Sequence, residues 1–218
     1  MAVDDIFDAV REGDLGRVRD LVEKDPGLAG SRDGEGLSVI LHARYRDRED
    51  MIEVLLSAGP ELDVLEASAI GDTDRVEQIL AADPRSVHVW SVDGYSPLHL
   101  AAFFGHARTA QLLLDRGADV SAVSRNRMEV MPLHSAVAGR HRAVAEALLS
   151  AGAPVDARTH GGFTPLLEAA QNGDRPLVEL LLSKGADPSV AADNGKTARD
   201  LALDAGHEDV ADLLEDRG

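Results

Sequence analysis

The chain has eight histidines and no cysteine. Its histidine and carboxylate side chains are therefore the groups that could do chemistry. The lack of cysteine excludes a disulfide framework, a thiolate zinc site and a cysteine nucleophile. No histidine lies in a His-x-x-x-His or Glu-x-x-His motif, the spacings that place two ligands on one helix face. We therefore expect no bound metal and no cofactor.

The motifs of the common enzyme classes are also absent from the sequence. It has no Gly-x-x-x-x-Gly-Lys-Ser/Thr phosphate loop, no Gly-x-Ser-x-Gly nucleophile turn and no Gly-x-Gly-x-x-Gly after a strand. We expect a protein that is not an enzyme, with no catalytic residue.

Four stretches repeat nearly the same residues, and their second residues are 35, 33 and 33 positions apart. A Ser or Thr before proline predicts a helix start, because its side chain caps the first turn and proline needs no hydrogen-bond partner there. A leucine-rich segment follows each and ends at a glycine, the usual helix C-terminus. The stretches are Ser96-Pro97-Leu98-His99, Met131-Pro132-Leu133-His134, Thr164-Pro165-Leu166-Leu167 and Thr197-Ala198-Arg199-Asp200.

This combination of period and residue types resembles the ankyrin repeat family. The resemblance implies an all-α repeat solenoid of seven helix-turn-helix units with finger turns, forming one array over residues 1–218 with a cap at each end. We expect a stand-alone, bacterial member of the family. The predicted units are 4–33, 34–63, 64–93, 94–126, 127–160, 161–194 and 195–218.

Several positions depart from the repeat. In the first and third units Asp25-Pro26 and Asp83-Pro84 replace the Thr-Pro-Leu-His residues, and we expect longer loops there. Asp47 and Arg140 replace the glycine between the two helices. The segment 44–48 is either a solvated helix end or part of a binding face, and spacing leaves both open. The resemblance implies that His99 and His134 hydrogen-bond the backbone between adjacent units.

The formal charge of −17 restricts the partners of the chain. An acidic surface repels nucleic-acid phosphates and anionic lipid head groups, so we expect neither partner. No run approaches the roughly 18 apolar residues of a membrane helix. The first residues are acidic where a secretory signal is basic, and we expect a cytoplasmic protein.

The resemblance also implies that partners bind the finger tips and the exposed side of the first helices. Of seven aromatic residues in the chain, five fall on such positions. Aromatic side chains dominate binding hot spots, and exposed apolar clusters are unusual on a monomer. The alternative is that Phe103 or Phe104 packs under a neighbouring finger. The predicted contact residues are Leu37, Tyr45, Arg46, Ile70, Tyr95, Phe103, Phe104, Arg125, Arg127, Met128, Val130, His160 and Phe163.

The finger at 125–128 lies in the interval that is two residues longer than the others, and residues 121–160 carry five arginines against three acidic residues. One interpretation is a tolerated insertion, since surface loops lengthen at little cost. The other is a basic contact for an acidic partner.

These observations predict a non-catalytic interaction module that binds another protein on its concave face. The alternative is a small-molecule binder or an enzyme with a cleft around Tyr45, Tyr95, His42 and Phe103. A further possibility is that a second copy covers the apolar face, so we expect a monomer or a weak homodimer.

Overall fold

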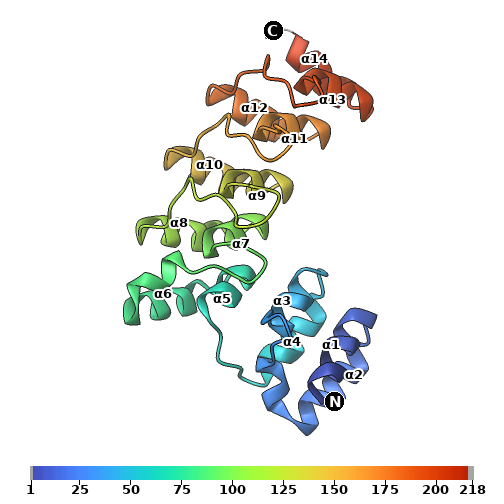
Figure 1. The fold of residues 1–218 in the computed structure, drawn as a ribbon, viewed down its shortest axis with the longest axis vertical. Helices are drawn as coiled ribbons and strands as arrows, with labels where there is room; N and C mark the ends of the chain where they lie inside the picture. Colours follow the sequence, from blue (N-terminus) through green and yellow to red (C-terminus); the bar gives the residue numbers. More distant parts are fainter. Residues whose placement is uncertain (1, 216–218) are drawn as a thin grey trace.

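The computed structural model describes residues 2–215 and shows helices stacked in pairs along one axis (Figure 1). Within this range there are fourteen α-helices and no named strand, as the repeat pattern predicts. The first helices of the pairs are α1 (Ala2–Glu12), α3 (Val39–Arg44), α5 (Val64–Ile70), α7 (Pro97–Phe103), α9 (Pro132–Ala138), α11 (Pro165–Gln171) and α13 (Ala198–Asp204). The second helices are α2 (Leu15–Lys24), α4 (Glu49–Ser57), α6 (Thr73–Ala82), α8 (Ala107–Asp115), α10 (Arg142–Ser150), α12 (Arg175–Ser183) and α14 (Glu208–Glu215).

The repeated Ser/Thr-Pro residues start the first helices as predicted. The side chain of Ser96 accepts a hydrogen bond from the backbone N–H of His99, and Thr164 does the same for Leu167. Pro97 and Pro165 occupy the first turn, where a missing N–H costs nothing. One helix pair falls in each predicted unit, and the unit boundaries stay a prediction.

The first and third units do not have the predicted longer loops. Asp25 accepts a hydrogen bond from the N–H of Gly27 at 3.0 Å, and Asp83 accepts one from that of Arg85 at 3.2 Å. Each aspartate caps a short 3₁₀-helix, η1 (Pro26–Gly30) and η2 (Pro84–His88). The prediction was wrong because an aspartate before proline can start a helix as well as a turn.

The core runs the length of the array, since α7 packs on α5 and α9, and α11 packs on α9 and α13. Most alanines on the first helices are fully buried and let neighbouring backbones approach closely, whereas Ala2 and Ala138 are exposed. Leucines of the second helices, among them Leu113, Leu148 and Leu181, fill the space between units. Each unit therefore completes the core of the next.

Buried histidines of the first helices hydrogen-bond the backbone of the following finger, and the family resemblance implied such contacts. His99 Nε2 donates to the carbonyl of Val130 at 3.0 Å, and His134 Nε2 donates to that of Ala157 at 3.0 Å. Burial lowers the pKa of His99 to about 4 and also lowers the pKa of His134. Both imidazoles are therefore neutral at neutral pH and serve the fold.

A second contact between units explains the two replaced glycines. The rings of His106, His141 and His207 lie against glycines of the preceding unit, where a Cβ atom would clash with them. The glycines in these contacts are Gly71, Gly105 and Gly173.

Where the following unit carries Asp72 or Asp174 at the histidine position, no ring occupies that place. The turn residue of the preceding unit is then not a glycine. It is Asp47 in the unit before Asp72 and Arg140 in the unit before Asp174, with φ of 53° and 61°. The turn conformation is the same in all units, and glycine is needed chiefly where a ring packs against it.

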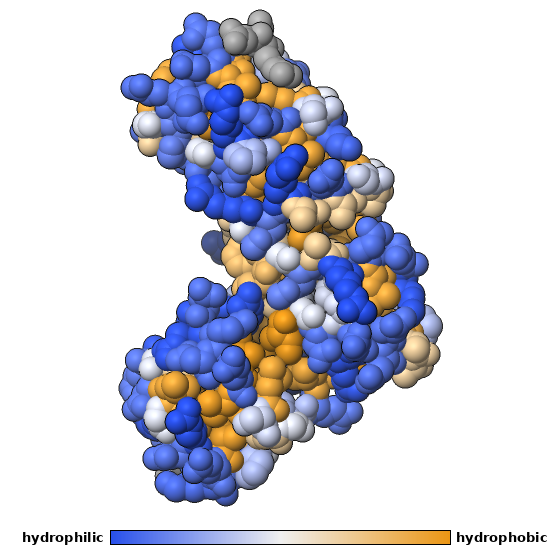
Figure 2. Space-filling view, turned by 180° about the vertical axis from the view of Figure 1, so that it is seen from behind, coloured by the Kyte–Doolittle hydropathy of each residue, from blue (hydrophilic) through white to orange (hydrophobic). Residues whose placement is uncertain are grey.

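The array bends between its second and third units. Helix α3 packs on α5, but the second helices α4 and α6 barely touch, and an extended connection leads into α5 (Figure 1). The guanidinium of Arg32 bridges this junction, lying 2.8 Å from the Asp63 carboxylate and 3.2 Å from that of Glu66. The molecule is a crescent with a hollow on one side, and apolar atoms are exposed where the amino-terminal helices meet the rest of the array (Figure 2).

Candidate functional site

A cavity of about 320 Å³ opens on the concave face and joins residues from four of the units, the second, fourth, fifth and sixth. We call it the aromatic cavity, because Tyr45, Tyr95 and Phe103 line it together with Met128. Tyr45 follows α3, Tyr95 and Met128 lie on the fingers before α7 and α9, and Phe103 ends α7. The other lining residues are His99, Leu100, Val130, His134, Ser135, Ala138 and Glu168.

The aromatic side chains are fixed by contacts with one another and with neighbouring polar groups. Tyr45 Oη donates to Asp93 Oδ2 at 2.7 Å, and burial together with this carboxylate raises the pKa of the tyrosine. Tyr95 Oη lies 3.6 Å from Met128 Sδ. Phe104 lies behind them, with ring centroids 5.8 Å from Tyr45 and 5.1 Å from Phe103. These side chains form a preorganised wall.

Several of these apolar side chains are nevertheless exposed. The exposed fraction is 36% for Tyr45, 42% for Phe103 and 57% for Met128. Large apolar side chains that are both ordered and exposed at one place are typical of a binding surface.

Glu168 brings a carboxyl group to this apolar cavity. Its side chain comes from the first turn of α11, and burial raises its pKa to about 7. Within residues 2–215, no hydrogen bond or ion pair engages this carboxylate. The other titratable side chains lining the cavity are the two neutral histidines and the two tyrosines, so Glu168 determines its charge.

The longer finger before α9 is held on both sides. Asn126 Nδ2 donates to the carbonyl of Asp93 at 2.9 Å, while its Oδ1 accepts from the N–H of Met128 at 3.0 Å. On the other side the N–H of His160 donates to the carbonyl of Met128 at 3.1 Å. The guanidinium of Arg125 stacks on Trp90 at 4.3 Å. These contacts hold Met128 in place at the cavity.

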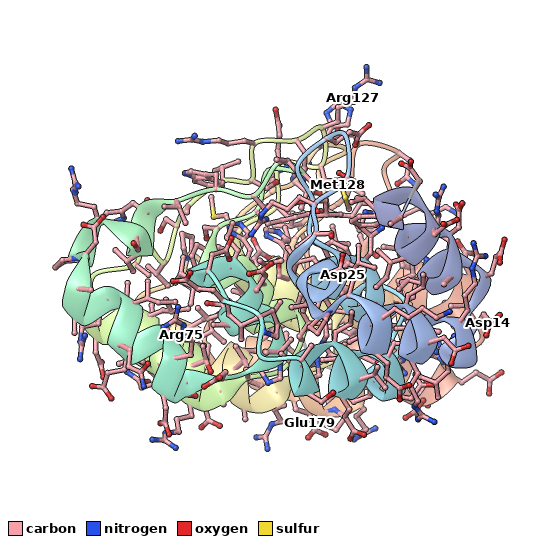
Figure 3. All side chains as sticks on the ribbon, turned by 90° about the horizontal axis from the view of Figure 1, so that it is seen from below. Asp14, Asp25, Arg75, Arg127, Met128 and Glu179 are labelled. Carbon is pink, nitrogen blue, oxygen red and sulfur yellow. The ribbon has the colours of Figure 1, made fainter. Side chains whose placement is uncertain are left out.

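Arg127 differs from its neighbours on this finger. It projects beyond the ribbon, while Met128 lies nearer the helices (Figure 3). Glu179 of α12 lies at the opposite edge of the molecule in the same view. Fingers and second helices thus occupy opposite sides of the array.

Five of the predicted contact residues line the cavity, and others do not. Tyr45, Tyr95, Phe103, Met128 and Val130 come together there. Phe104 does not line the cavity: its ring is half-buried and packs against the core, with the Arg44 guanidinium 4.4 Å from its centroid, in line with the alternative that one of the two phenylalanines packs inward. Outside the cavity, Leu37, Ile70 and Phe163 are also half-buried against the core, whereas Arg46, Arg125, Arg127 and His160 are exposed.

Of the four residues of the alternative cleft, Tyr45, Tyr95 and Phe103 line the aromatic cavity, and His42 does not. His42 Nε2 lies 2.6 Å from Asp33 Oδ2, and its ring packs edge-on against Phe7 at 4.9 Å. These contacts hold His42 at the finger of its own unit and at α1, away from the aromatic cavity.

Glu168 is the functional candidate that the sequence analysis missed. It follows the Thr-Pro-Leu-Leu residues at the repeat position of Leu100 and Ser135, both of which are buried and line the cavity. The available signal was a glutamate at the repeat position whose residues in the two preceding units, Leu100 and Ser135, are buried. It could be used only once the register of the repeats was combined with the place of the cavity.

The described part of the chain has neither a metal-binding cluster nor a membrane-spanning helix. Residues 2–215 contain no group of three or more His, Asp or Glu side chains placed to hold a metal ion. No helix in the same range has the length and apolar character needed to cross a membrane.

Comparison with known proteins agrees with the repeat architecture. A family model described as ankyrin repeats (3 copies) matches residues 6–120, 64–159 and 151–218. The chain is 33% identical over 172 residues to the mouse protein "Ankyrin repeat and SAM domain-containing protein 6", covering 76% of this chain and 16% of that protein. It is 30% identical over 206 residues to the rice "Probable E3 ubiquitin-protein ligase XBOS32", covering 90% of this chain and 40% of that protein.

A bacterial relative matches a shorter segment. The chain is 42% identical over 65 residues to the "Putative ankyrin repeat protein YahD" of Escherichia coli (strain K12), covering 28% of this chain and 32% of that protein. The chain spans less than half the length of the mouse and rice relatives. The matched repeats extend over nearly all of the described residues, and the chain belongs to the ankyrin repeat family.

Proposed function

We propose that the chain is a non-catalytic module that binds another protein in the cytoplasm through its concave face, with the aromatic cavity at the centre of the contact. The observation that carries this proposal is the exposure of Tyr45, Phe103 and Met128 around one cavity. An exposed aromatic cluster of this kind loses unfavourable contact with water when a partner covers it.

The rigidity of the site supports binding without a large ordering cost. The finger contacts of Asn126 and the hydroxyl contact of Tyr45 hold the wall of the cavity before any partner arrives. Preorganised surfaces retain more of their contact energy as affinity. The formal charge of −17 disfavours nucleic acid and anionic lipid as the partner.

A small-molecule ligand is the second candidate, and the size of the cavity favours it. The volume of about 320 Å³ lies at the lower end of the roughly 300–1,000 Å³ of ligand sites. A small ligand would occupy the cavity alone, whereas a protein partner would also contact the fingers and the exposed ends of the first helices.

Site-specific photo-cross-linking in the native cell tests the proposal. A photoreactive phenylalanine analogue replaces Phe103 in one variant and Glu179, on the opposite edge of the molecule (Figure 3), in a matched control. We expect a discrete cross-linked protein from position 103 and not from position 179. The Met128→Ala change should weaken this cross-link, because hot-spot side chains commonly contribute about 2 kcal/mol or more.

Three outcomes would contradict protein binding through this face. They are the same cross-linked proteins from both positions, no cross-linked protein from position 103, or a small molecule that co-purifies with the chain and is lost with Met128→Ala. Cross-links between two copies of the chain, together with a dimer in sedimentation, would identify the partner as a second copy.

A further inference from the structure

The aromatic cavity contains an acceptor that nothing in the described part of the chain satisfies. The Glu168 carboxylate is largely buried there and has no hydrogen-bond or ion-pair partner among residues 2–215. Buried carboxylates are normally paired, because an unpaired charge loses its hydration without compensation. Glu168 is therefore free to accept from a group that arrives from outside the chain.

The surroundings of Glu168 indicate the chemistry of that group. The aromatic rings of Tyr45, Tyr95 and Phe103 present electron-rich faces, and the Met128 sulfur is polarizable. Aromatic faces attract cations, and a carboxylate attracts them more strongly. An anion would be repelled by Glu168, and an apolar group would leave the carboxylate unpaired.

We propose that the aromatic cavity binds a positively charged side chain, arginine or lysine, of the partner protein, with its cationic group between the aromatic rings and the Glu168 carboxylate. This proposal rests on the proposed function and names the residue type that the partner inserts. The neutral state of His99 and His134 leaves no positive charge in the lining that would oppose it.

The arginines near the opening do not supply the missing cation themselves. Arg125 stacks on Trp90, and Arg127 projects away from the array (Figure 3). Arg44 stacks on the half-buried Phe104 and pairs with Glu49 at 3.1 Å. None of the three lines the cavity, so Glu168 remains available to a partner.

The shape of the site favours a side chain carried on a peptide. The volume of about 320 Å³ admits one extended side chain and not a helix or a strand. The cavity joins residues of four units along the concave face, so the backbone of a bound segment has fingers and helix ends to contact on either side. A free amine would lack these additional contacts.

Peptide titration followed by amide NMR of the full chain tests the inference. The probes are acetylated, amidated Gly-Gly-Xaa-Gly-Gly peptides in which Xaa is arginine, lysine, citrulline or glutamate, and N-acetylarginine amide serves as the free ligand. Citrulline has the shape of arginine without its charge. We expect the arginine and lysine peptides to shift the signals of Tyr45, Tyr95, Phe103 and Glu168, and the neutral and acidic peptides to leave them unchanged.

Variants separate the roles of charge and ring. Glu168→Gln keeps the size of the side chain and should weaken binding of the arginine peptide roughly tenfold or more. Glu179→Gln removes the same charge at the opposite edge and should leave the affinity unchanged. Phe103→Leu keeps an apolar side chain without a π face and should weaken binding by about 2- to 5-fold.

Equal binding of the citrulline and arginine peptides, or parental affinity in Glu168→Gln, would overturn the inference. So would N-acetylarginine amide binding as tightly as the peptide, which would identify a free cationic ligand. If cross-linking from position 103 persists while Glu168→Gln changes nothing, the cation site is wrong and the protein-binding function stands. If the arginine peptide binds but position 103 captures no protein, the proposed function is wrong.

Discussion

At the scale of single residues, Glu168 is both the proposed binding group of the cavity and a residue that affects the stability of the fold. Burial raises the pKa of Glu168 to about 7 from an ordinary value of 4.5, because the charged form loses hydration. Between these two pH values the folded chain retains a proton that the unfolded chain releases. The contribution of Glu168 to the free energy of unfolding must then fall as pH rises through this interval and stay constant above it.

Glu168→Gln is expected to stabilise the unliganded protein, and the gain should grow with pH. The gain should be near zero below pH 4.5, where both states hold the proton, and at most about 3 kcal/mol above pH 7, at 1.36 kcal/mol per pKa unit. Urea denaturation of the parent and the variant at a series of pH values measures it. Glu179→Gln is the exposed control and should show no such trend. A pH-independent difference, or a less stable variant at alkaline pH, would mean that Glu168 is paired in the protein.

At the scale of elements, adjacent units recognise each other at the turn between the two helices. His106 Nε2 donates to the carbonyl of Ala69 at 3.0 Å, and its ring lies over Gly71, whose φ is 77°. The turn of one unit is thus shaped by the side chain that begins the second helix of the next. This contact is made by two residues in different units, so a substitution at one of them alters the packing of the other.

Gly71→Ala should destabilise the protein more than Gly117→Ala. Both glycines have positive φ, of 77° and 87°, and alanine at either loses about 1–2 kcal/mol from the backbone alone. A Cβ atom at Gly71 would in addition clash with the His106 ring, whereas at Gly117 no atom of the described residues, apart from its chain neighbours, lies within 4 Å of a Cβ atom. Chemical denaturation of both variants measures the difference. Equal losses would show that the ring moves aside without cost.

At the scale of the whole molecule, the bend between α3 and α5 divides the array into a short and a long part. Arg44 joins the two: its Nε donates to the carbonyl of Ala69 at 3.1 Å, and its guanidinium stacks on Phe104. It also pairs with Glu49 of α4. One side chain thus connects α3, α4, α5 and the end of α7 at the place where α4 and α6 barely touch.

Arg44→Ala should uncouple the two parts. We expect the free energy of unfolding to fall by about 1–3 kcal/mol, the contribution of a hydrogen bond from a charged group together with its packing. Because each unit of a solenoid is stabilised by its neighbours, helices α1–α4 should then unfold at lower urea concentration than α7–α12. Hydrogen exchange resolved by helix measures this. Arg46→Ala is the control, since Arg46 is exposed and, among residues 2–215, its side chain bonds only to the nearby His42. A single transition at the parental midpoint in Arg44→Ala would exclude this role.

The amino-acid sequence by itself determined the architecture and the structural histidines. Helix caps, prolines, glycines and leucine-rich segments are local signals, and their recurrence at a constant period specifies stacked units. The same register placed Tyr45, Tyr95 and Phe103 on one face, because equivalent positions of a repeat point in equivalent directions. Their arrangement around the aromatic cavity agrees with that register.

The tertiary structure alone decided what each of these side chains contacts. Phe104 is adjacent to Phe103 in sequence, yet its ring packs against the core under the guanidinium of Arg44, which comes from α3, two units earlier in the array. Glu168 stands in an ordinary helical turn, and its isolation from any cation follows from the packing of four units around one cavity. Burial and pairing depend on groups distant in the chain, and a repeat pattern specifies directions but not which groups meet.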